Sequence, residues 1–224
     1  RWLQDAELLM GANLDRQNLE ELDFNLASIK IKKIENNNIK IKIYKNNYQL
    51  LNGIYNSFPG SAYLDINEGN LYIISSTGII GKSQLIDNKK LRFNQIDNNI
   101  SNFINKKQFK KKNWYSIKDL MINKNQIYVS YSDEIYEDCW ATSLLQGELN
   151  DNYISFKIIF RPDQCAHSTN NPDKEFNAHQ SGGRIISLND NSLLFSHGDY
   201  RQRQFGQDIS SVFGKILKIN LIDN

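Results

Sequence analysis

The residues of this chain whose types could do chemistry gather in one segment near its carboxyl end. Residues 177–208 read NAHQSGGRIISLNDNSLLFSHGDYRQRQFGQD and include two of the three histidines. His179 precedes one strand-like run, and Asp199 follows the next. A carboxylate beside a histidine fixes the imidazole tautomer and stabilises the imidazolium, so such a pair is suited to general-base catalysis. Between them, Gly182 and Gly183 permit a tight backbone turn and leave room for a ligand.

The positions of these residues along the chain predict that they meet in space. The two strand-like runs are separated by an Asn-rich turn, which favours an antiparallel pair. Antiparallel neighbours place the start of one strand beside the end of the next. We therefore expect His179 and Asp199 to lie at the same edge of a sheet, with His197 and Tyr200 close by. The alternative is a histidine–aspartate hydrogen bond that only ties two loops together.

The same strand–turn–strand layout occurs three times, at residues 62–78, 117–134 and 182–199. Two further strand-like runs follow each of the first two copies, and GKILKINL alone follows the third. Units of four strands in about 40–50 residues are typical of β-propeller blades. We therefore predict an all-β fold, a partial β-propeller of about three blades over residues 29–224. A β-sandwich has similar strands but does not repeat one layout three times.

Residues 1–28 have a different pattern. Leucines such as Leu19, Leu22 and Leu26 recur at spacings of three and four residues, which predicts a short helical or linker segment before the propeller. The chain begins at Arg1 rather than Met and shows no signal-peptide pattern, so we expect an upstream signal or membrane anchor. Because three blades do not close a ring, we also expect a longer protein.

Composition and charge narrow the classes of partner. The net charge is only +2, which gives no basis for electrostatic capture of nucleic acid, so we expect no nucleic-acid partner. The apolar content of 40% is that of an ordinary globular domain and argues against disorder. No stretch approaches the roughly 20 apolar residues needed to span a bilayer.

The two cysteines and the acidic residues leave alternatives open. Cys139 and Cys165 are not a CxxC pair: they form one disulfide in an exported chain or two thiols in a cytosolic one. The segment Cys165–His167, taken with His179, fits no zinc pattern. Four carboxylates within residues 132–138 offer oxygen ligands for calcium, but without the spacing of an EF-hand.

The motifs HQSGGRI, GD, QD and GKILKINL, in this order over residues 177–221, resemble the PQQ-dependent glucose/sorbosone dehydrogenase family of soluble aldose sugar dehydrogenases. The resemblance continues more weakly from about Tyr48 and covers the N-terminal half of such a domain. It implies a six-bladed propeller. It also implies a location in the periplasm, or a secreted or cell-envelope protein. It also implies a quinoprotein oxidoreductase that oxidises the C1 hydroxyl of an aldose.

Carried over residue by residue, the resemblance also implies roles. His179 would be the base that takes the C1 hydroxyl proton while hydride passes to the quinone, and Asp199 would assist it. Gln204, Gln202 and Arg201 would contact the sugar or the cofactor. A calcium ion, with ligands expected downstream of this segment, would hold PQQ and polarise its carbonyl. The alternative is a non-catalytic propeller of the same superfamily that serves as a binding or interaction module.

Overall fold

The computed structural model describes residues 22–29, 43–47, 62–86, 91–104, 107–108, 115–171 and 174–221 of the 224. Its strands form three sheets, and we call the repeating units within them blades 1, 2 and 3. Among the described residues, no helix has the length and apolar character needed to cross a membrane.

Blade 1 is a four-stranded antiparallel meander with strands added at its outer edge. Its members are β3 (Ala62–Asn67), β4 (Asn70–Ser75), β5 (Ile80–Gln84) and β6 (Leu91–Asn98). Beyond β6 the sheet continues with β1 (Leu22–Ile29) and β2 (Ile43–Asn47), while β10 (Tyr153–Ile154) pairs with β6 in parallel. Through β10, the chain of the second unit reaches back to the first.

Blades 2 and 3 repeat this order. Blade 2 consists of β7 (Ile117–Asn123), β8 (Gln126–Tyr136), β9 (Cys139–Glu148) and β11 (Phe156–Phe160), with β12 (Ala166–His167) paired to β9. Blade 3 has three strands, β13 (Gly182–Asn189), β14 (Ser192–His197) and β15 (Lys215–Asn220). The three copies of the layout predicted from the sequence are the hairpins β3–β4, β7–β8 and β13–β14.

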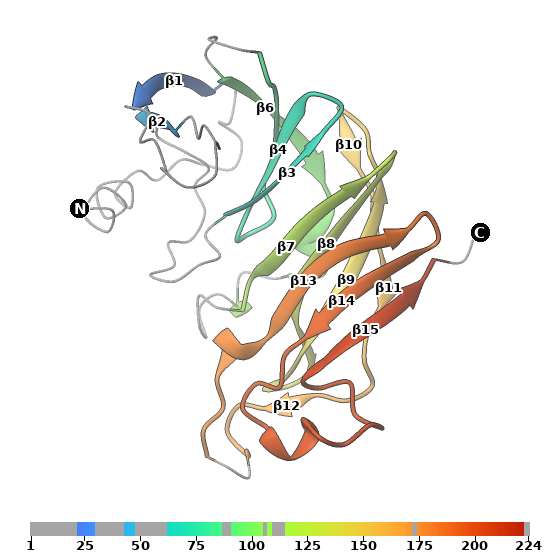
Figure 1. The fold of residues 1–224 in the computed structure, drawn as a ribbon. Coiled ribbons are helices and arrows are strands. Elements are labelled where there is room, and N and C mark those ends of the chain that lie inside the picture. Colours follow the sequence, from blue (N-terminus) through green and yellow to red (C-terminus); the bar gives the residue numbers. More distant parts are fainter. Residues whose placement is uncertain are drawn as a thin grey trace, which may run out of the picture.

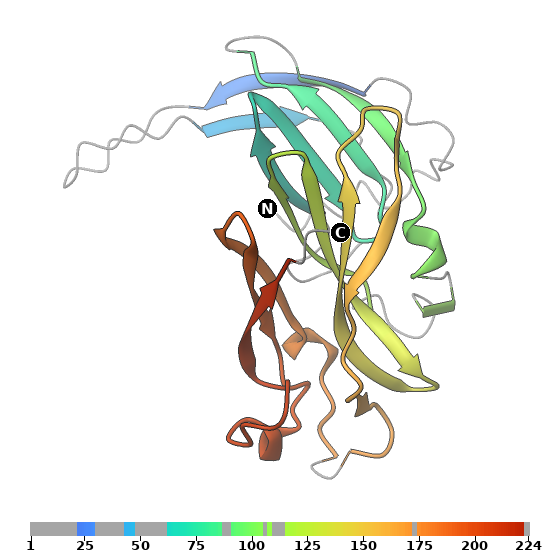
Figure 2. The ribbon, with the colours of Figure 1, turned by 90° about the vertical axis from the view of Figure 1, so that its right-hand side faces the viewer.

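The blades stand side by side, with blade 2 between the other two (Figures 1 and 2). Their first strands are neighbours, because β7 contacts β3 on one side and β13 on the other. This arrangement is a partial β-propeller, which confirms the predicted fold class.

Apolar side chains fill the space between the blades. One core cluster joins blade 1 residues such as Ile74 and Ile80 to blade 2 residues such as Val129 and Leu145. Another joins the opposite face of blade 2 to blade 3, through the residues Met121, Tyr128, Leu144, Ile185, Leu193 and Phe195. Because both faces of blade 2 are covered, its middle strands β8 and β9 are buried along most of their length.

Aspartates on the first strands dock each blade on the next. Asp65 of β3 accepts a hydrogen bond from the backbone N–H of Ile122 on β7 at 2.7 Å. Asp119 of β7 accepts one from the N–H of Ile185 on β13 at 2.8 Å, and it also pairs with Arg184 at 2.7 Å. A carboxylate that accepts a backbone N–H satisfies a donor that the blade's own sheet leaves unpaired. These contacts align the blades as well as joining them.

The expectation of a helix over residues 1–28 is wrong for its last part. Residues from Leu22 onward form strand β1, which pairs with β6. The sequence LDFNLASI alternates apolar and polar residues as well as carrying leucines at helical spacing. Pairing with the edge of β6 decides between these two patterns. Residues 1–21 lie outside the described part of the chain.

Cys139 and Cys165 form a disulfide. It connects the start of β9 to the segment just before β12, next to the short antiparallel pairing of β12 with β9. Of the alternatives left open by the sequence, the structure therefore has the disulfide and not two thiols. Neither cysteine is a thiolate that could bind a metal.

Candidate active site

The segments that carry His179 and Asp199 lie side by side where β13 begins and β14 ends, and we call this end of blade 3 the mouth. His179 is in the short 3-10 helix η2 (Ala178–Gln180) that leads into β13, and Asp199 follows β14. Backbone hydrogen bonds join the two segments: the N–H of Gly198 to the carbonyl of Ser181 at 2.8 Å, and the N–H of Tyr200 to the carbonyl of Gln180 at 3.0 Å. The antiparallel pairing of β13 with β14 continues into these turns.

Short side chains shape both turns. The Oδ1 atom of Asn177 accepts a hydrogen bond from the N–H of His179 at 2.9 Å and so caps η2. The Oδ1 atom of Asp199 accepts one from the N–H of Arg201 at 2.9 Å. Tyr200 and Arg201 have φ values of 51° and 65°, a left-handed conformation that costs side-chain-bearing residues about 1 kcal/mol or more each. His179 and Asp199 are both half-buried residues, and the Nε2 atom of His179 is itself buried.

A buried hydrogen-bonded cluster behind these turns holds them against blade 2. Thr142 of β9 donates its hydroxyl to the carbonyl of Ser181 at 2.7 Å, and its backbone N–H donates to Nε2 of His197 at 3.1 Å. The Thr142 hydroxyl has one hydrogen, so in its 2.8 Å contact with the hydroxyl of Tyr200 it is the acceptor. We call Thr142, Ser181, His197 and Tyr200 the Thr142 cluster.

His197 is neutral in this cluster. Its Nε2 accepts a backbone N–H, so its proton is on Nδ1, which donates to the carbonyl of Gly198 at 2.9 Å. Burial lowers the pKa of His197 to about 4, although its hydrogen bond to Gly198 acts in the opposite direction. Since this side chain is only 2% exposed, it is a structural histidine and not a base that reaches substrate.

Aromatic rings pack beneath the turns that carry His179 and Asp199. Tyr115 and Trp140 stack with centroids 3.5 Å apart, and Phe176 stacks on Tyr200 at 5.6 Å. Phe213 meets His197 edge-on at 4.9 Å. The rings belong to one buried cluster that also includes Ala178, the residue before His179. The turn that carries His179 therefore rests on a packed surface.

Two arginines give the mouth positive charge. Arg201 and Arg203 both pair with Glu175, at 3.3 Å and 2.7 Å, and all three side chains reach solvent. Gln204 is exposed, whereas Gln202 is 5% exposed. The resemblance assigns three residues to the sugar or the cofactor. Of these, Arg201 and Gln204 are open to solvent, whereas Gln202 is almost completely buried.

The glycine pair has a different role from the one expected. Gly182 and Gly183 have φ values of 68° and 108°, which confirms the need for glycine in the turn. The space beside them is not room for a ligand. A Cβ on Gly182 would lie 2.6 Å from the backbone nitrogen of Gly198, and one on Gly183 would collide with the Cβ of Lys118 on β7. Close approach to the neighbouring segment and blade explains both glycines.

The acidic segment of residues 132–138 is also engaged within the protein. Asp133 is buried and accepts hydrogen bonds from Tyr131, Ser143 and Arg161, with the Arg161 Nε at 2.9 Å. Glu134 accepts one from the N–H of Asp138. In the part of the chain that the structure describes, no group of three or more histidine, cysteine, aspartate or glutamate side chains is placed to hold a metal ion. The calcium alternative for this segment is replaced by an Arg161–Asp133 ion pair.

Sequence reasoning identified the segments of the site but missed what supports them. Thr142 and Asn177 were not singled out, although both contact the segment with His179. The signal for Thr142 was a pair of hydroxyl residues within the otherwise apolar run WATSLL. In a strand buried on both faces, a hydroxyl needs a partner.

Over blades 2 and 3, the partial β-propeller is similar in sequence to a known protein family. Residues 117–223 match the sequence model of the family "Glucose / Sorbosone dehydrogenase". This match confirms the family resemblance over blades 2 and 3, a little under half of the chain. No curated protein sequence matches the chain.

The fold is similar to that of a solved glucose dehydrogenase. A crystal structure of glucose dehydrogenase has a TM-score of 0.50 and 17% sequence identity, with 70% of this chain and 44% of that chain covered. The soluble aldose sugar dehydrogenase of Escherichia coli, in the apo-form, has a TM-score of 0.49 and 18% identity, with 71% and 43% covered. The present chain thus spans less than half the length of these structures, and at these identities the likeness concerns the fold.

Proposed function

We propose that this chain is part of a PQQ-dependent sugar dehydrogenase in which His179 takes the proton from the C1 hydroxyl of an aldose and Asp199 assists. One observation carries the proposal. Within the segment that matches the family, the turn with His179 is hydrogen-bonded along its backbone to the turn with Asp199. A general base needs a positioned imidazole and a nearby group that favours its protonated form, and in this proposal His179 and Asp199 would have these two roles.

The protein's own residues would act as follows. The neutral ring of His179 accepts the hydroxyl proton, and the negative charge of Asp199 favours the resulting imidazolium. Asn177 holds the backbone of His179, and the Thr142 cluster holds Ser181 two residues further on. Because Thr142 is on blade 2, this contact would help to keep the base in place while sugar enters and product leaves.

The charge of the mouth suits an anionic cofactor. Two guanidinium groups share the single carboxylate of Glu175, so the group has net positive charge. PQQ has several carboxylates, and arginine binds carboxylates with paired hydrogen bonds. Arg201 and Gln204 would hold it from the solvent side, and Gln202 would contribute the small part of its surface that is exposed. When bound with calcium, this quinone supplies the acceptor for the hydride from C1.

The disulfide supports the proposed location. Such bonds persist in oxidising compartments and are rare in the cytosol. The bond between Cys139 and Cys165 therefore favours a periplasmic or secreted protein. Mass spectrometry of protein purified from its native host, with and without reductant, would test this, and two free thiols would contradict it.

The experiment that tests the function is an assay of dye-linked oxidation of a panel of aldoses. It would use the protein from its full reading frame, with and without PQQ and calcium. His179→Ala should abolish the cofactor-dependent activity. The matched control is His167→Ala, which removes an exposed histidine of β12. We expect the control to keep full activity.

Binding of PQQ, followed by the change in its absorbance, separates the two roles of the site. If His179→Ala binds PQQ normally but oxidises no sugar, His179 acts in the chemistry. If Arg201→Ala weakens PQQ binding, the positive mouth contacts the cofactor. If the unaltered protein neither binds PQQ nor oxidises any aldose, the proposal is wrong, and the non-catalytic binding propeller becomes the better description.

A further inference from the structure

Lys215, the first residue of β15, holds its ammonium group against three backbone carbonyls. Its Nζ atom lies 2.9 Å from each of the carbonyl oxygens of Phe205, Gly206 and Phe213. An ammonium group has three hydrogens, so each carbonyl accepts one of them. Hydrogen bonds from a charged group are roughly twice as strong as those between neutral groups. We call this arrangement the Lys215 tripod.

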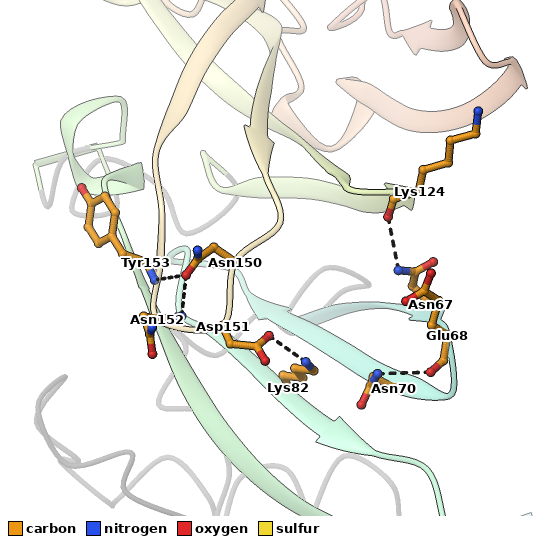
Figure 3. Close-up of polar contacts among 9 residues, drawn as sticks. All are labelled: Asn67, Glu68, Asn70, Lys82, Lys124, Asn150, Asp151, Asn152 and Tyr153. Atoms are coloured by element: carbon orange, nitrogen blue, oxygen red, sulfur yellow. Dashed lines mark hydrogen bonds and ion pairs between the residues drawn. The ribbon is translucent and has the colours of Figure 1, made fainter.

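Two other lysines of the chain pair with a carboxylate instead. Lys82 of β5 donates to Asp151 at 2.7 Å, as Figure 3 shows. Lys124 pairs with Asp190, also at 2.7 Å. Such ion pairs join two side chains at the surface and contribute little to stability. Lys215 joins three points of the backbone, so it fixes the path of the chain.

The three carbonyls belong to the loop of residues 198–214, which connects β14 to β15. This loop carries four residues of the proposed site, which are Asp199, Arg201, Gln202 and Gln204. Gln204 is the middle residue of the 3-10 helix η3 (Arg203–Phe205). Two of the three carbonyls, those of Phe205 and Gly206, therefore come directly after Gln204 in the chain. The tripod holds the loop at this point.

The tripod also closes the second half of the loop. Gly206 and Gly214 are its two ends and approach each other closely, because a Cβ on Gly214 would be 3.4 Å from the Cα of Gly206. Compact surface loops of about 6–16 residues whose ends are close are Ω-loops, and they are frequently functional. The ammonium group binds carbonyls on both sides of this neck, so it keeps the neck closed.

Among the described residues, little apolar packing supports η3. Arg203 and Gln204 are exposed, and the half-buried ring of Phe205 stacks on that of Phe213 with centroids 5.8 Å apart. The ion pair of Arg203 with Glu175 is at the surface. A segment with few buried contacts opens readily unless polar contacts hold it. The position of Gln204 thus depends on the tripod.

We propose that Lys215 is a positioning residue for Gln204, an inference that rests on the proposed function. Its ammonium group holds the backbone after Gln204, so that the side-chain amide of Gln204 stays where the cofactor contacts it. A side chain that is held in place before the cofactor arrives loses less freedom on binding, so the affinity is higher. Lys215 uses all three of its N–H donors within the protein and has none left for the cofactor itself.

Hydrogen exchange of the cofactor-free protein, from its full reading frame, tests whether Lys215 holds the loop. Lys215→Met keeps the apolar part of the side chain and removes the ammonium group. The hydrogen-bonded amides of Phe205, Gly206 and Asp208 should then exchange at least about 10-fold faster, because three charge-assisted hydrogen bonds are lost. Lys218→Met, on the exposed side of β15, is the matched control and should leave these three amides unchanged.

Rescue by an added amine separates the hydrogen bonds from the charge. Lys215→Ala leaves space for n-propylammonium, which matches the part of the lysine side chain that this variant lacks. We expect n-propylammonium to slow the exchange again, whereas tetramethylammonium has the same charge but no N–H and should not. Sodium chloride at the same ionic strength is the second control. Equal slowing by both organic cations would mean that charge alone acts, and it would refute the tripod.

The dissociation constant of PQQ tests the link to the site. Lys215→Met should raise it by about 10-fold. Sugar turnover at saturating PQQ should change by less than about 2-fold, because the Thr142 cluster holds the turns with His179 and Asp199. Lys215→Arg keeps the positive charge, but its planar guanidinium does not direct three N–H groups from one point, so it should weaken PQQ binding as well. Lys82→Met, which removes a paired ammonium group on blade 1, should bind PQQ normally.

Three results would overturn the inference. The first is unchanged exchange of the loop amides in Lys215→Met. The second is faster exchange together with unaltered PQQ binding, which would mean that the loop does not position a cofactor contact. The third is normal PQQ binding by Lys215→Arg, which would mean that only the charge matters. If the unaltered protein binds no PQQ, the proposed function is wrong and this inference falls with it, whereas normal binding that is insensitive to Lys215 refutes this inference alone.

Discussion

Lowering the pH from 7 to 5 should destabilise this chain by about 2 kcal/mol through His197. The side chain is 2% exposed, and its two ring nitrogens are both engaged, one by the N–H of Thr142 and the other by the carbonyl of Gly198. A proton on Nε2 would leave the N–H of Thr142 without an acceptor and would put a charge among the rings of Phe195, Tyr200 and Phe213. The cluster therefore favours the neutral ring.

The magnitude follows from the pKa values of the two states. In the unfolded chain the ordinary pKa is 6.5, and in the folded chain burial lowers it to about 4. Below pH 6.5 the unfolded chain binds a proton at His197 that the folded chain does not bind. The stabilisation by neutral His197 is therefore complete above that pH and is lost as the pH falls. At 1.36 kcal/mol per pH unit, the loss reaches about 2 kcal/mol at pH 5 and about 3 kcal/mol near pH 4.

Urea denaturation at pH 7, 6 and 5 would measure this loss for the unaltered protein and for His197→Gln. The carbonyl of glutamine can accept the N–H of Thr142 in place of Nε2, but it does not titrate. Carboxylates that titrate in both proteins cancel in the comparison. The stability difference between the two proteins should therefore change by about 2 kcal/mol between pH 7 and pH 5. His167→Gln, on the exposed surface of β12, should follow the unaltered protein throughout.

Two outcomes would refute this reasoning. If His197→Gln and the unaltered protein lose stability in parallel, the ring of His197 titrates normally and is not held neutral by the cluster. If the unaltered protein gains stability on acidification relative to the variant, the folded state stabilises the imidazolium, and the tautomer assigned from the hydrogen bonds is wrong.

Three further predictions concern contacts between distant parts of the chain. Cys139→Ser should lower the unfolding free energy by about 3 kcal/mol, because the disulfide closes a loop across a sequence separation of 26, and urea midpoints unchanged by reductant would contradict this. Asp119→Ala should lower the unfolding free energy by about 2 kcal/mol, since it leaves the buried backbone N–H of Ile185 unpaired. Arg184→Ala, at a side chain 65% exposed, should lower it by less than about 1 kcal/mol. Equal losses would show that the hydrogen bond from Ile185 to Asp119 is not the main contact. Thr142→Val keeps the shape of the side chain but removes two hydrogen bonds, so amides of residues 198–200 should exchange hydrogen at least about 10-fold faster, and unchanged exchange would show that the Thr142 cluster does not hold that turn.

The strands and their order were predictable because they depend on neighbouring residues. Period-two alternation and Asn-rich turns operate over a few residues, so the hairpins at 62–78, 117–134 and 182–199 could be recognised without any knowledge of their packing. The repetition of one layout then indicated a propeller. Where two local patterns overlapped, as in LDFNLASI, the sequence did not choose between helix and strand, and pairing with β6 decided.

The sequence by itself determined the blades, the need for glycine at positions 182 and 183, and the pairing of the segments that carry His179 and Asp199. Only the tertiary structure decided what surrounds them. It filled the space beside Gly183 with Lys118, joined the cysteines, and brought Thr142 to His197 across 55 residues. The physical reason is that turns and strands follow from local backbone preferences, whereas contacts between blades depend on how whole sheets pack. Residues that are far apart in the sequence therefore provide most of the support of this site.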